Sequence, residues 1–415
     1  MAWFKKATEK AKGLVHDHEG TQSGGQYPHQ QQQQPMGPPA PGPPSEPVKV
    51  DNITTSFRTC GLQQSNFPHV FRDGGGGGVV GGKHLIIFAD GMYTKGQPPT
   101  DPSRIVSFVS NSIAVAGDGA VSGPPTLTRV TDFGDATHGP QQAVPFLTDQ
   151  GESAMATAIW PNHNIAPLPG TNGTRGVAFT EVIDRNLFKQ QKFALLYNTP
   201  IDIHLDAQSG TPVVSRPVKN LFNVGEPMFG SFCIVHPDLM PNGGDGYLYL
   251  FGRVSEAANH KSNGLKLARV RPEAFADRRQ YEFWDGQQFG PRMPALDDGG
   301  AANVLDFSLD AFGKWYGPAT GDIWWSPVYN EYIMLFQSGA AAVDDSLYLS
   351  HSTSLTGGWS KPVSIYKIPR FPDGYSYAFH AYPAMDPTGQ TVPLSWTQDS
   401  KTQSCRIYTG EVLFS

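Results

Sequence analysis

Short runs of β-forming residues, separated by glycine, proline, asparagine and aspartate, recur along almost the whole chain from about residue 52 onward. Runs such as HLIIFAD (84–90), GYLYLFGRV (246–254) and RIYTGEVLF (406–414) have the length and the β-branched or aromatic content of strands. Helical periodicity is nearly absent, since only PEAFADRRQYEF (272–283) has room for a turn or two. The pattern predicts an all-β chain, and many short, evenly spaced strands are typical of a sandwich, a barrel or a propeller.

The first fifty residues have a different character. Residues 1–20 could form an amphipathic helix, with Trp3 and Leu14 on its apolar face and lysines at its edges, which suits a membrane surface or a protein partner. A short solvated helix is the plainer alternative. Residues 21–51 are rich in Gln, Pro and Gly and are predicted to be a disordered linker. The folded domain is therefore expected over residues 52–415.

Composition and charge exclude some classes of function. A net charge of -6, a pI near 6.0 and the absence of any block of like charges exclude a nucleic-acid footprint. Cys60, Cys233 and Cys405 have no C-x-x-C spacing and are expected to pack as small apolar residues. No secretory h-region is found, so we expect a cytoplasmic protein, with unconventional secretion as the alternative. We also expect a monomer.

A repeat longer than a hairpin favours the propeller among the all-β folds. Each copy has an acid or a His at its head, then an apolar run, a Pro or Asn turn and a further strand, as in GEPMFGSFCIVHPD. In the first copy, FRDGGGGGVVGGKHLIIF, the glycines are interpreted as a lengthened turn. The five heads, which predict five blades, are Asp73, Glu152, Glu226, Asp322 and His380.

These heads are expected to start the innermost strands and to converge at one end of the propeller axis. Any single Gly-Glu or Gly-Asp before a strand is more simply a turn residue. As a group, however, four acids at matching positions would repel one another unless they bind something or one of them is protonated. No cofactor is expected, although Ca²⁺ held at the axis by oxygen ligands stays open.

A second acid in the first repeat indicates a possible chemistry. Asp90 ends the run HLIIFAD and would border the same funnel as Asp73. Glycosidic-bond hydrolysis needs such a pair, with one carboxyl group protonating the leaving oxygen and the other activating water or attacking the anomeric carbon. Tryptophans in the repeats would suit sugar rings, although blade packing explains most of them; Trp324 is the candidate contact.

The first repeat also resembles a known family. RDGGGGGVVGGKHLIIFADG is similar to the opening of five-bladed propeller glycosidases, and most similar to the endo-D-arabinanases of glycoside hydrolase family 183, first catalogued as a domain of unknown function. Looser matches such as DSLYLSHSTSLTGGWSKPVSIY and HAYPAMDPTGQTVPLSWT extend the resemblance from about residue 56 to the end. The resemblance implies an acid pair at Asp73 and Asp90, with further carboxylates and a His lining the funnel.

Two functions therefore stay open. The first is a glycoside hydrolase that acts on a furanose-containing glycan, with Asp73 and Asp90 catalytic and with substrate-binding residues Glu152, Glu226, Asp322, His380 and Trp324. The second is a non-catalytic sugar-binding or scaffold propeller that is tethered through its N-terminal tail.

Overall fold

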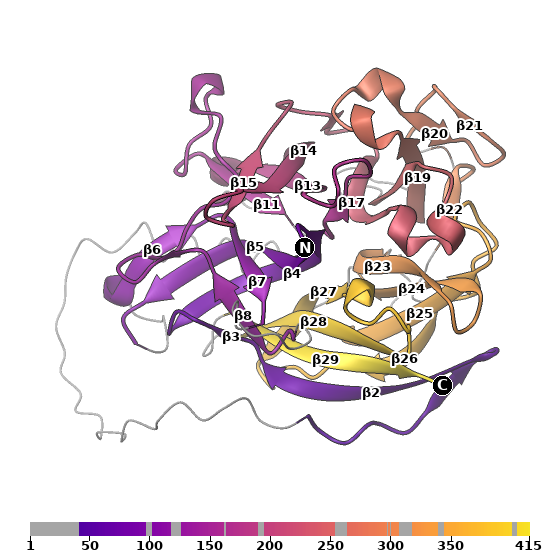
Figure 1. Cartoon of the computed structure of the whole chain (residues 1–415), viewed down its shortest axis with the longest axis horizontal. Coiled ribbons are helices and arrows are strands. Elements are labelled where there is room, and N and C mark those ends of the chain that lie inside the picture. The colour runs from indigo at the N-terminus through magenta and orange to yellow at the C-terminus, as the bar shows by residue number, and fades with distance from the viewer. Residues whose placement is uncertain are drawn as a thin grey trace.

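Five sheets of four to six strands surround a common axis in the computed structural model of the chain (Figure 1). The structure describes residues 41–96, 102–117, 126–161, 163–189, 195–253, 264–296, 298, 300–306, 318–338, 344–400 and 405–415. The sheets follow one another along the chain and each is one blade, so the predicted all-β, five-bladed propeller is confirmed.

The first two blades come from the segment between residues 64 and 223. Blade one contains β3 (Gln64–Ser65), β4 (Val70–Val80), β5 (Lys83–Thr94), β6 (Ile105–Val109), β7 (Ser112–Ala116) and β8 (Arg129–Asp132). The ribbon of β9 (Gly134–Asp135) and β10 (Gly139–Pro140) follows. Blade two contains β11 (Thr157–Pro161), β12 (Ala166–Pro167), β13 (Arg175–Asp184), β14 (Leu195–Leu205), β15 (Pro212–Ser215) and β16 (Phe222–Asn223), with the short helix α2 (Arg185–Lys189) after β13.

The remaining three blades complete the ring. Blade three contains β17 (Met228–Val235), β18 (Leu248–Arg253), β19 (Gly264–Val270), β20 (Glu282–Trp284), β21 (Phe289–Gly290) and β22 (Asn303–Asp306). Blade four contains β23 (Pro318–Ser326), β24 (Glu331–Ser338), β25 (Ser346–Ser352) and β26 (Val363–Lys367). Blade five contains β27 (Gly374–Ala381), β28 (Thr391–Ser400) and β29 (Arg406–Phe414), together with β1 (Val48–Val50) and β2 (Ile53–Leu62).

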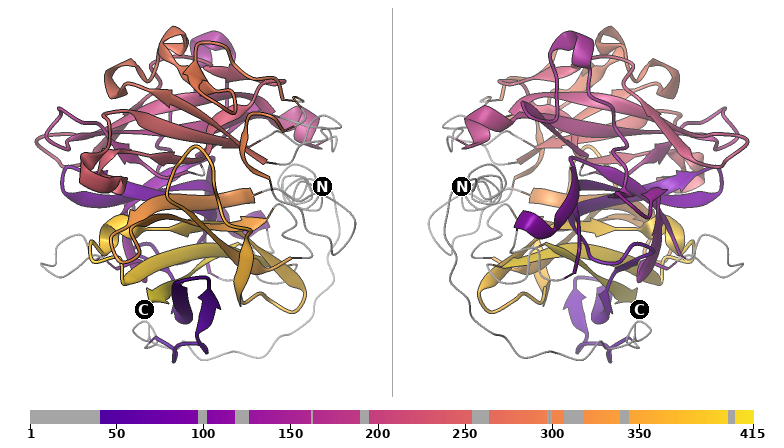
Figure 2. Two further views of the ribbon diagram at one scale, coloured as in Figure 1. Left: turned by 90° about the vertical axis from the view of Figure 1, so that its right-hand side faces the viewer. Right: turned by 90° about the vertical axis from the view of Figure 1, so that its left-hand side faces the viewer.

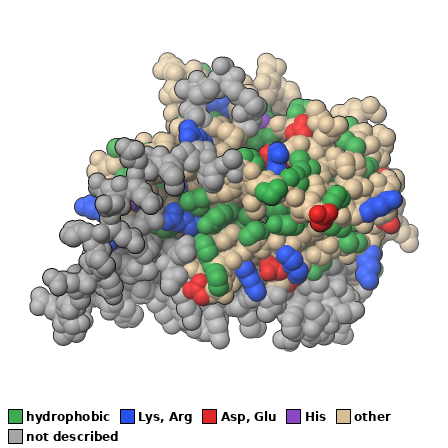
Figure 3. All heavy atoms as spheres, turned by 90° about the horizontal axis from the view of Figure 1, so that it is seen from below, with side chains coloured by type: hydrophobic (Ala, Val, Ile, Leu, Met, Phe, Trp, Pro, Cys, Tyr) green, Lys and Arg blue, Asp and Glu red, His purple; other side chains and the backbone are tan. Residues whose placement is uncertain are grey.

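The two ends of the described chain close the ring together. β2 pairs antiparallel with β29, from Thr55 opposite Phe414 to Leu62 opposite Tyr408. The side views show these first strands as a projection beside the C-terminus (Figure 2). Seen from below, hydrophobic side chains are interspersed with acidic and basic ones over the described part of the surface (Figure 3). Because β1 begins at Val48, the last blade includes residues ahead of the predicted boundary at residue 52.

Apolar side chains hold neighbouring blades together. In β5, Leu85 and Ile87 pack against blade two, whereas Ile86 and Phe88 pack against Tyr382 and Ile407 of blade five. This alternation follows from the period of two in a strand, which sends successive side chains to opposite faces of a sheet. Similar apolar clusters lie between the other neighbouring blades. The apolar run of β5 is therefore buried on both faces.

The glycine run is part of an inner strand and is not a lengthened turn, which corrects the interpretation from sequence. A Cβ atom on Gly76 would lie 2.0 Å from the carbonyl oxygen of His163, and one on Gly78 would lie 1.9 Å from that of Ile165. Ile165 donates a backbone hydrogen bond to Gly77 at 3.1 Å. Glycine is required because the backbone of blade two approaches β4 too closely for any side chain.

The predictions for residues 1–40 lie outside the described residues. None of the helices in the described ranges has the length and apolar character that crossing a bilayer requires. The stretch 272–283 contains two single-turn 3₁₀ helices, η5 (Pro272–Ala274) and η6 (Arg278–Gln280), as its sequence indicated.

Candidate active site

The strand β4 runs from one end of the propeller axis toward the other. It begins at Val70 and carries Asp73 in its first half, while Gly77, Gly78 and Val79 in its second half line a cavity at the far end. A strand rises by about 3.3 Å per residue, so roughly 16 Å of backbone separates Asp73 from Gly78. The predicted site residues therefore divide between two places.

Asp73 and Asp90 lie on paired strands at the same end of the axis. Arg72 pairs with Gly91 and Gly74 pairs with Phe88, so Ala89 and Asp90 together stand opposite the single residue Asp73. This is a β-bulge, a feature that re-aims side chains and is common beside active sites. The structure thus brings the two acids that sequence selected as a pair next to each other on the backbone.

Blade five reaches across to Asp73. The hydroxyl group of Tyr377 in β27 donates a hydrogen bond of 2.7 Å to Oδ2 of Asp73 and lies 3.1 Å from Sγ of Cys405. Burial raises the pKa of Tyr377 well above its ordinary value, and the negative charge of Asp73 raises it further. Tyr377 is therefore neutral, and its hydroxyl group lies in hydrogen-bond contact with the Asp73 carboxyl group. Tyr375 stacks on it with ring centroids 5.2 Å apart.

A cation from blade two faces Asp90. Arg185, the first residue of α2, places its guanidinium 3.6 Å from Oδ1 of Asp90. The same guanidinium donates hydrogen bonds to the Thr157 carbonyl at 2.9 Å and to Oγ of Ser110 at 2.7 Å. These contacts fix its direction and hold its positive charge beside Asp90.

A further ion pair lies between blades two and three. Glu181 in β13 accepts a hydrogen bond of 2.5 Å from Arg253 at the end of β18, and only 9% of Glu181 is exposed. Sequence reasoning missed this pair, and it also missed Arg185 and Tyr377. The available signal was one acid within the apolar run RGVAFTEVI, because a charged residue is rarely buried unless it is paired.

Asp322 and His380 meet in the interior of the ring. Oδ2 of Asp322 lies 3.3 Å from Nδ1 of His380 and accepts a hydrogen bond of 2.8 Å from the backbone amide of Ala381. His163 is fully buried, and neither ring nitrogen has a hydrogen-bond partner among the described residues. Burial lowers the pKa of His163 well below its ordinary value, and the positive charge of Arg253 adds to this effect.

The position of His380 differs from the expectation that every head starts an inner strand. It is the second-last residue of β27, whereas Asp73 and Asp322 lie within β4 and β23. In the repeat HAYPAMDPTGQ, the head residue therefore corresponds to the end of an inner strand and not to its start. His380 nevertheless reaches Asp322 because β23 and β27 are inner strands of adjacent blades.

Glu152 precedes β11 and is held within blade two. Arg216 contacts both of its carboxylate oxygens, at 2.9 Å for Oε1, and Tyr197 also donates to Oε1. Burial acts to raise the pKa of Glu152, but the hydrogen bonds from Arg216, Tyr197 and the Leu147 amide outweigh it, so the pKa is lowered. Among these contacts, none links Glu152 to the other predicted site residues.

Glu226 has a similar environment in blade three. It forms two hydrogen bonds with Arg278 of η6, of 2.8 and 2.6 Å, and it accepts another from the amide of Asn223. Burial acts to raise the pKa of Glu226, whereas Arg278 and Asn223 lower it, and the lowering prevails. The carboxylate that precedes this apolar strand thus forms an ion pair with an arginine of its own blade.

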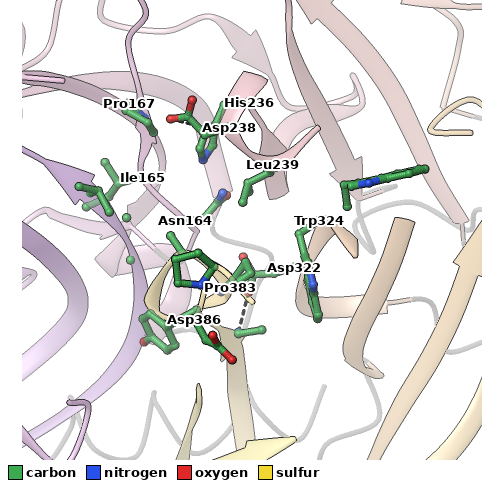
Figure 4. A pocket seen from close by; sticks show the side chains of 18 of the residues that line it. Asn164, Ile165, Pro167, His236, Asp238, Leu239, Asp322, Trp324, Pro383 and Asp386 are labelled. Carbon is green, nitrogen blue, oxygen red and sulfur yellow. Dashed lines mark hydrogen bonds and ion pairs between the residues drawn. The ribbon is translucent and has the colours of Figure 1, made fainter. Parts of the chain in front are cut away.

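Trp324 lies at the other end of the axis from Asp73. Together with Asp322 it lines a cavity of about 370 Å³ between the ends of the inner strands (Figure 4). Only 2% of Trp324 is exposed, and its indole packs edge-on against Phe414. Its main role in the structure is therefore packing between blades four and five.

The described residues contain no group of three or more His, Cys, Asp or Glu side chains that could hold a metal ion. Oδ2 of Asp322 contacts the amide of Ala381 and Nδ1 of His380. An axial Ca²⁺ site, which would need six to eight oxygen ligands, stays a prediction.

Comparisons with known proteins show similarity of fold. No family model and no curated protein matches the chain. A crystal structure titled "putative hydrolase" from Bacteroides ovatus ATCC 8483 has a TM-score of 0.54 and 14% identity, covering 86% of this chain and 90% of that one. A GH43 β-1,3-galactosidase has a TM-score of 0.48 and 10% identity over 85% of this chain and 93% of that one. An exo-β-1,3-galactanase from Phanerochaete chrysosporium has a TM-score of 0.46 and 12% identity over 82% of this chain and 60% of that one.

Proposed function

We propose that the protein is a glycoside hydrolase whose catalytic carboxyl groups are Asp73 and Asp90. The observation that carries the proposal is the β-bulge that sets Asp90 opposite Asp73 at one end of the propeller axis. Two carboxyl groups in different environments are what acid–base cleavage of a glycosidic bond requires.

The surroundings support different roles for the two acids. Arg185 faces Asp90 at 3.6 Å and favours its carboxylate form, which suits a base or a nucleophile. Asp73 lies against the buried phenol of Tyr377 and near the thiol of Cys405. We assign Asp73 as the proton donor to the leaving oxygen.

The remaining polar residues would bind and orient the sugar. The pair of Glu181 and Arg253 offers charged hydrogen-bonding groups from blades two and three. Asp322 orients His380, whose Nε2 makes no hydrogen bond with the described residues. A furanose-containing glycan such as arabinan is the substrate that the sequence resemblance favours. Glu152 and Glu226, each bound by an arginine of its own blade, stabilise the scaffold.

The test is oligosaccharide release from arabinans, arabinogalactans and fungal wall glycans, followed by chromatography. The parent protein should release products, and Asp73→Asn and Asp90→Asn should each lose nearly all turnover while keeping the parent melting temperature. Asp149→Asn is the matched control, because Asp149 is an exposed residue of the short helix η2 (Thr148–Gln150). An unchanged rate for Asp73→Asn would contradict the proposal.

The assigned roles can be separated with substrates and nucleophiles. An aryl glycoside with a good leaving group needs little protonation, so Asp73→Asn should keep much more activity on it than on the polymer. Asp90→Gly should lose activity on both substrates and regain it with added azide. If no substrate is cleaved but a glycan still binds the folded protein, the non-catalytic alternative holds.

A further inference from the structure

The cavity at the far end of the axis is not lined by Asp73, Asp90, Glu181 or Arg253, and it shares only Asp322 with the proposed active site. Its walls come from the ends of β4 and β23 and from the connections that follow β11, β17 and β27. Trp324 and Trp325 form part of one wall, and Ile165 and Leu239 add further apolar surface. In the close view, Ile165 lies across the cavity from Trp324 (Figure 4).

The charged side chains among the described lining residues of this cavity are all acidic. Asp238, Asp322 and Asp386 line it, and none of the described lining residues is a lysine or an arginine. Hydrogen bonds from Thr388 and Thr391 lower the pKa of Asp386 in spite of its burial, so this carboxyl group stays ionised. The cavity therefore repels phosphates and carboxylates and favours neutral or cationic ligands.

The two histidines of the cavity do not offset this negative charge. Burial lowers the pKa of His236 to about 3, and burial also lowers the pKa of His84, so both imidazoles are neutral at neutral pH. A neutral imidazole keeps one nitrogen as a hydrogen-bond acceptor. It would accept a hydrogen bond from a donor on a ligand.

His236 also presents a buried polar atom that lacks a hydrogen bond. The residue is 5% exposed, and its Nδ1 makes no hydrogen bond with the described residues. The closest acid oxygen, Oδ2 of Asp238, is 3.7 Å away, which is too long for a hydrogen bond. Burying such an atom without a partner is costly, and a ligand in the cavity would remove that cost.

We propose that this cavity binds a small organic ammonium compound, an amine carried on an apolar or sugar body. Asp238, whose side chain is 77% exposed at the mouth, and Asp386, on the opposite side in Figure 4, would attract the cation. The indole walls suit an organic cation because aromatic faces attract positive charge. The volume of about 370 Å³ lies within the range of small-ligand pockets.

Isothermal titration calorimetry with two matched pairs of probes tests the proposal. Choline is compared with 3,3-dimethylbutan-1-ol, in which carbon replaces the charged nitrogen, and glucosamine is compared with glucose. We expect saturable binding of at least one ammonium probe, with its neutral partner at least about tenfold weaker. Equal affinity within both pairs, or no saturable binding of either ammonium probe, would overturn the proposal.

Variants locate the binding. Asp238→Asn should weaken ammonium binding by roughly two- to fivefold, because it removes an exposed carboxylate that attracts the cation. The core should stay intact, since the side chain of Asp238 is mostly exposed. Trp325→Ala should weaken it as well, and Trp325→Phe, which keeps an aromatic ring, should restore part of the affinity. Asp285→Asn is the surface control, since Asp285 is exposed in the turn after β20. Unchanged binding in Asp238→Asn would place the ligand elsewhere.

The test of ammonium binding is independent of the proposed hydrolase activity. Asp73→Asn should bind the ammonium probe as the parent does, because Asp73 lies toward the other end of β4. A protein that lacks hydrolase activity could still bind the amine, and an active hydrolase could fail to bind it. Loss of ammonium binding in Asp73→Asn would therefore contradict the assignment to this cavity.

Discussion

The hydroxyl group of Tyr377 in blade five donates a hydrogen bond of 2.7 Å to Asp73 in blade one, so the last blade directly supports an acid of the first. The contact spans the seam of the ring, where β27 packs against β4. Closure by β2 and β29 holds this seam together. The candidate catalytic group therefore depends on a strand at the other end of the chain.

Tyr377→Phe should lower the turnover number on a cleaved glycan by roughly 10- to 100-fold, because a hydrogen bond to a charged or partly charged carboxyl group contributes about 1.5–3 kcal/mol. Tyr375→Phe is the matched control, since that hydroxyl donates to Asp399 at 3.3 Å. The measurement is kcat and KM for both variants beside the parent. Equal losses in the two variants would contradict a specific role for the bond between Tyr377 and Asp73.

The glycine run provides a test of the fold. Gly78→Ala should destabilise the protein by about 2 kcal/mol or more, because the new Cβ would lie 1.9 Å from the carbonyl oxygen of Ile165 and the blades would have to separate. Gly290→Ala is the control, since no atom lies within 4 Å of its added Cβ. Urea denaturation measures both variants. A Gly78→Ala variant as stable as the parent would mean that β4 and blade two are less closely packed.

Sequence predicted the architecture well because strand periodicity and blade repeats depend on local patterns. Leu85 and Ile86 alternate between blades two and five, and this pattern is visible in the printed residues. The pair of Asp73 and Asp90 was also visible, because both acids flank one hairpin. Sequence alone did not predict that Tyr377 and Arg185 contact these acids from other blades. Contacts between distant segments of the chain produce no periodic pattern in the sequence.

The same limit explains the heads of the repeats. A Gly-Glu before a strand has one appearance in sequence whether the carboxylate faces the axis or an arginine of its own blade. Glu152 meets Arg216 and Glu226 meets Arg278, and these arginines lie 64 and 52 residues further along the chain. Only the packed structure distinguishes these ion pairs within one blade from the contact between Asp322 and His380.

His236 should make the protein less stable in mild acid. Its folded pKa of about 3 lies below its ordinary value of 6.5, so below pH 6.5 the unfolded chain takes up a proton that the native chain does not. The resulting stability is complete above pH 6.5 and falls by up to about 1.4 kcal/mol per pH unit as the pH drops toward 3. His236→Gln should flatten the curve of unfolding free energy against pH between 6.5 and 4, measured with urea.

The control for that curve is His138→Gln, because the His138 side chain is 70% exposed. The two variants are compared by the change that each makes in the slope of the parent curve. The comparison uses slopes and not absolute stabilities, since any substitution of a buried residue changes packing. If the curve for His236→Gln runs parallel to that of the parent, the imidazole of His236 takes up its proton in the native protein as well.

Glu152→Gln should lower the unfolding free energy at pH 7 by about 3–5 kcal/mol, because Arg216 would be left buried without its charge partner. The folded pKa of Glu152 is lowered from 4.5, so its contribution is complete above pH 4.5 and is lost as the pH falls through the folded pKa. The parent and the variant should therefore differ most at neutral pH and converge in acid. Urea denaturation at pH 7 and at pH 3.5 measures the difference. If Glu152 binds substrate instead, the variant would keep its stability and raise KM, whereas a buried structural pair predicts lower stability with an unchanged KM for the folded fraction.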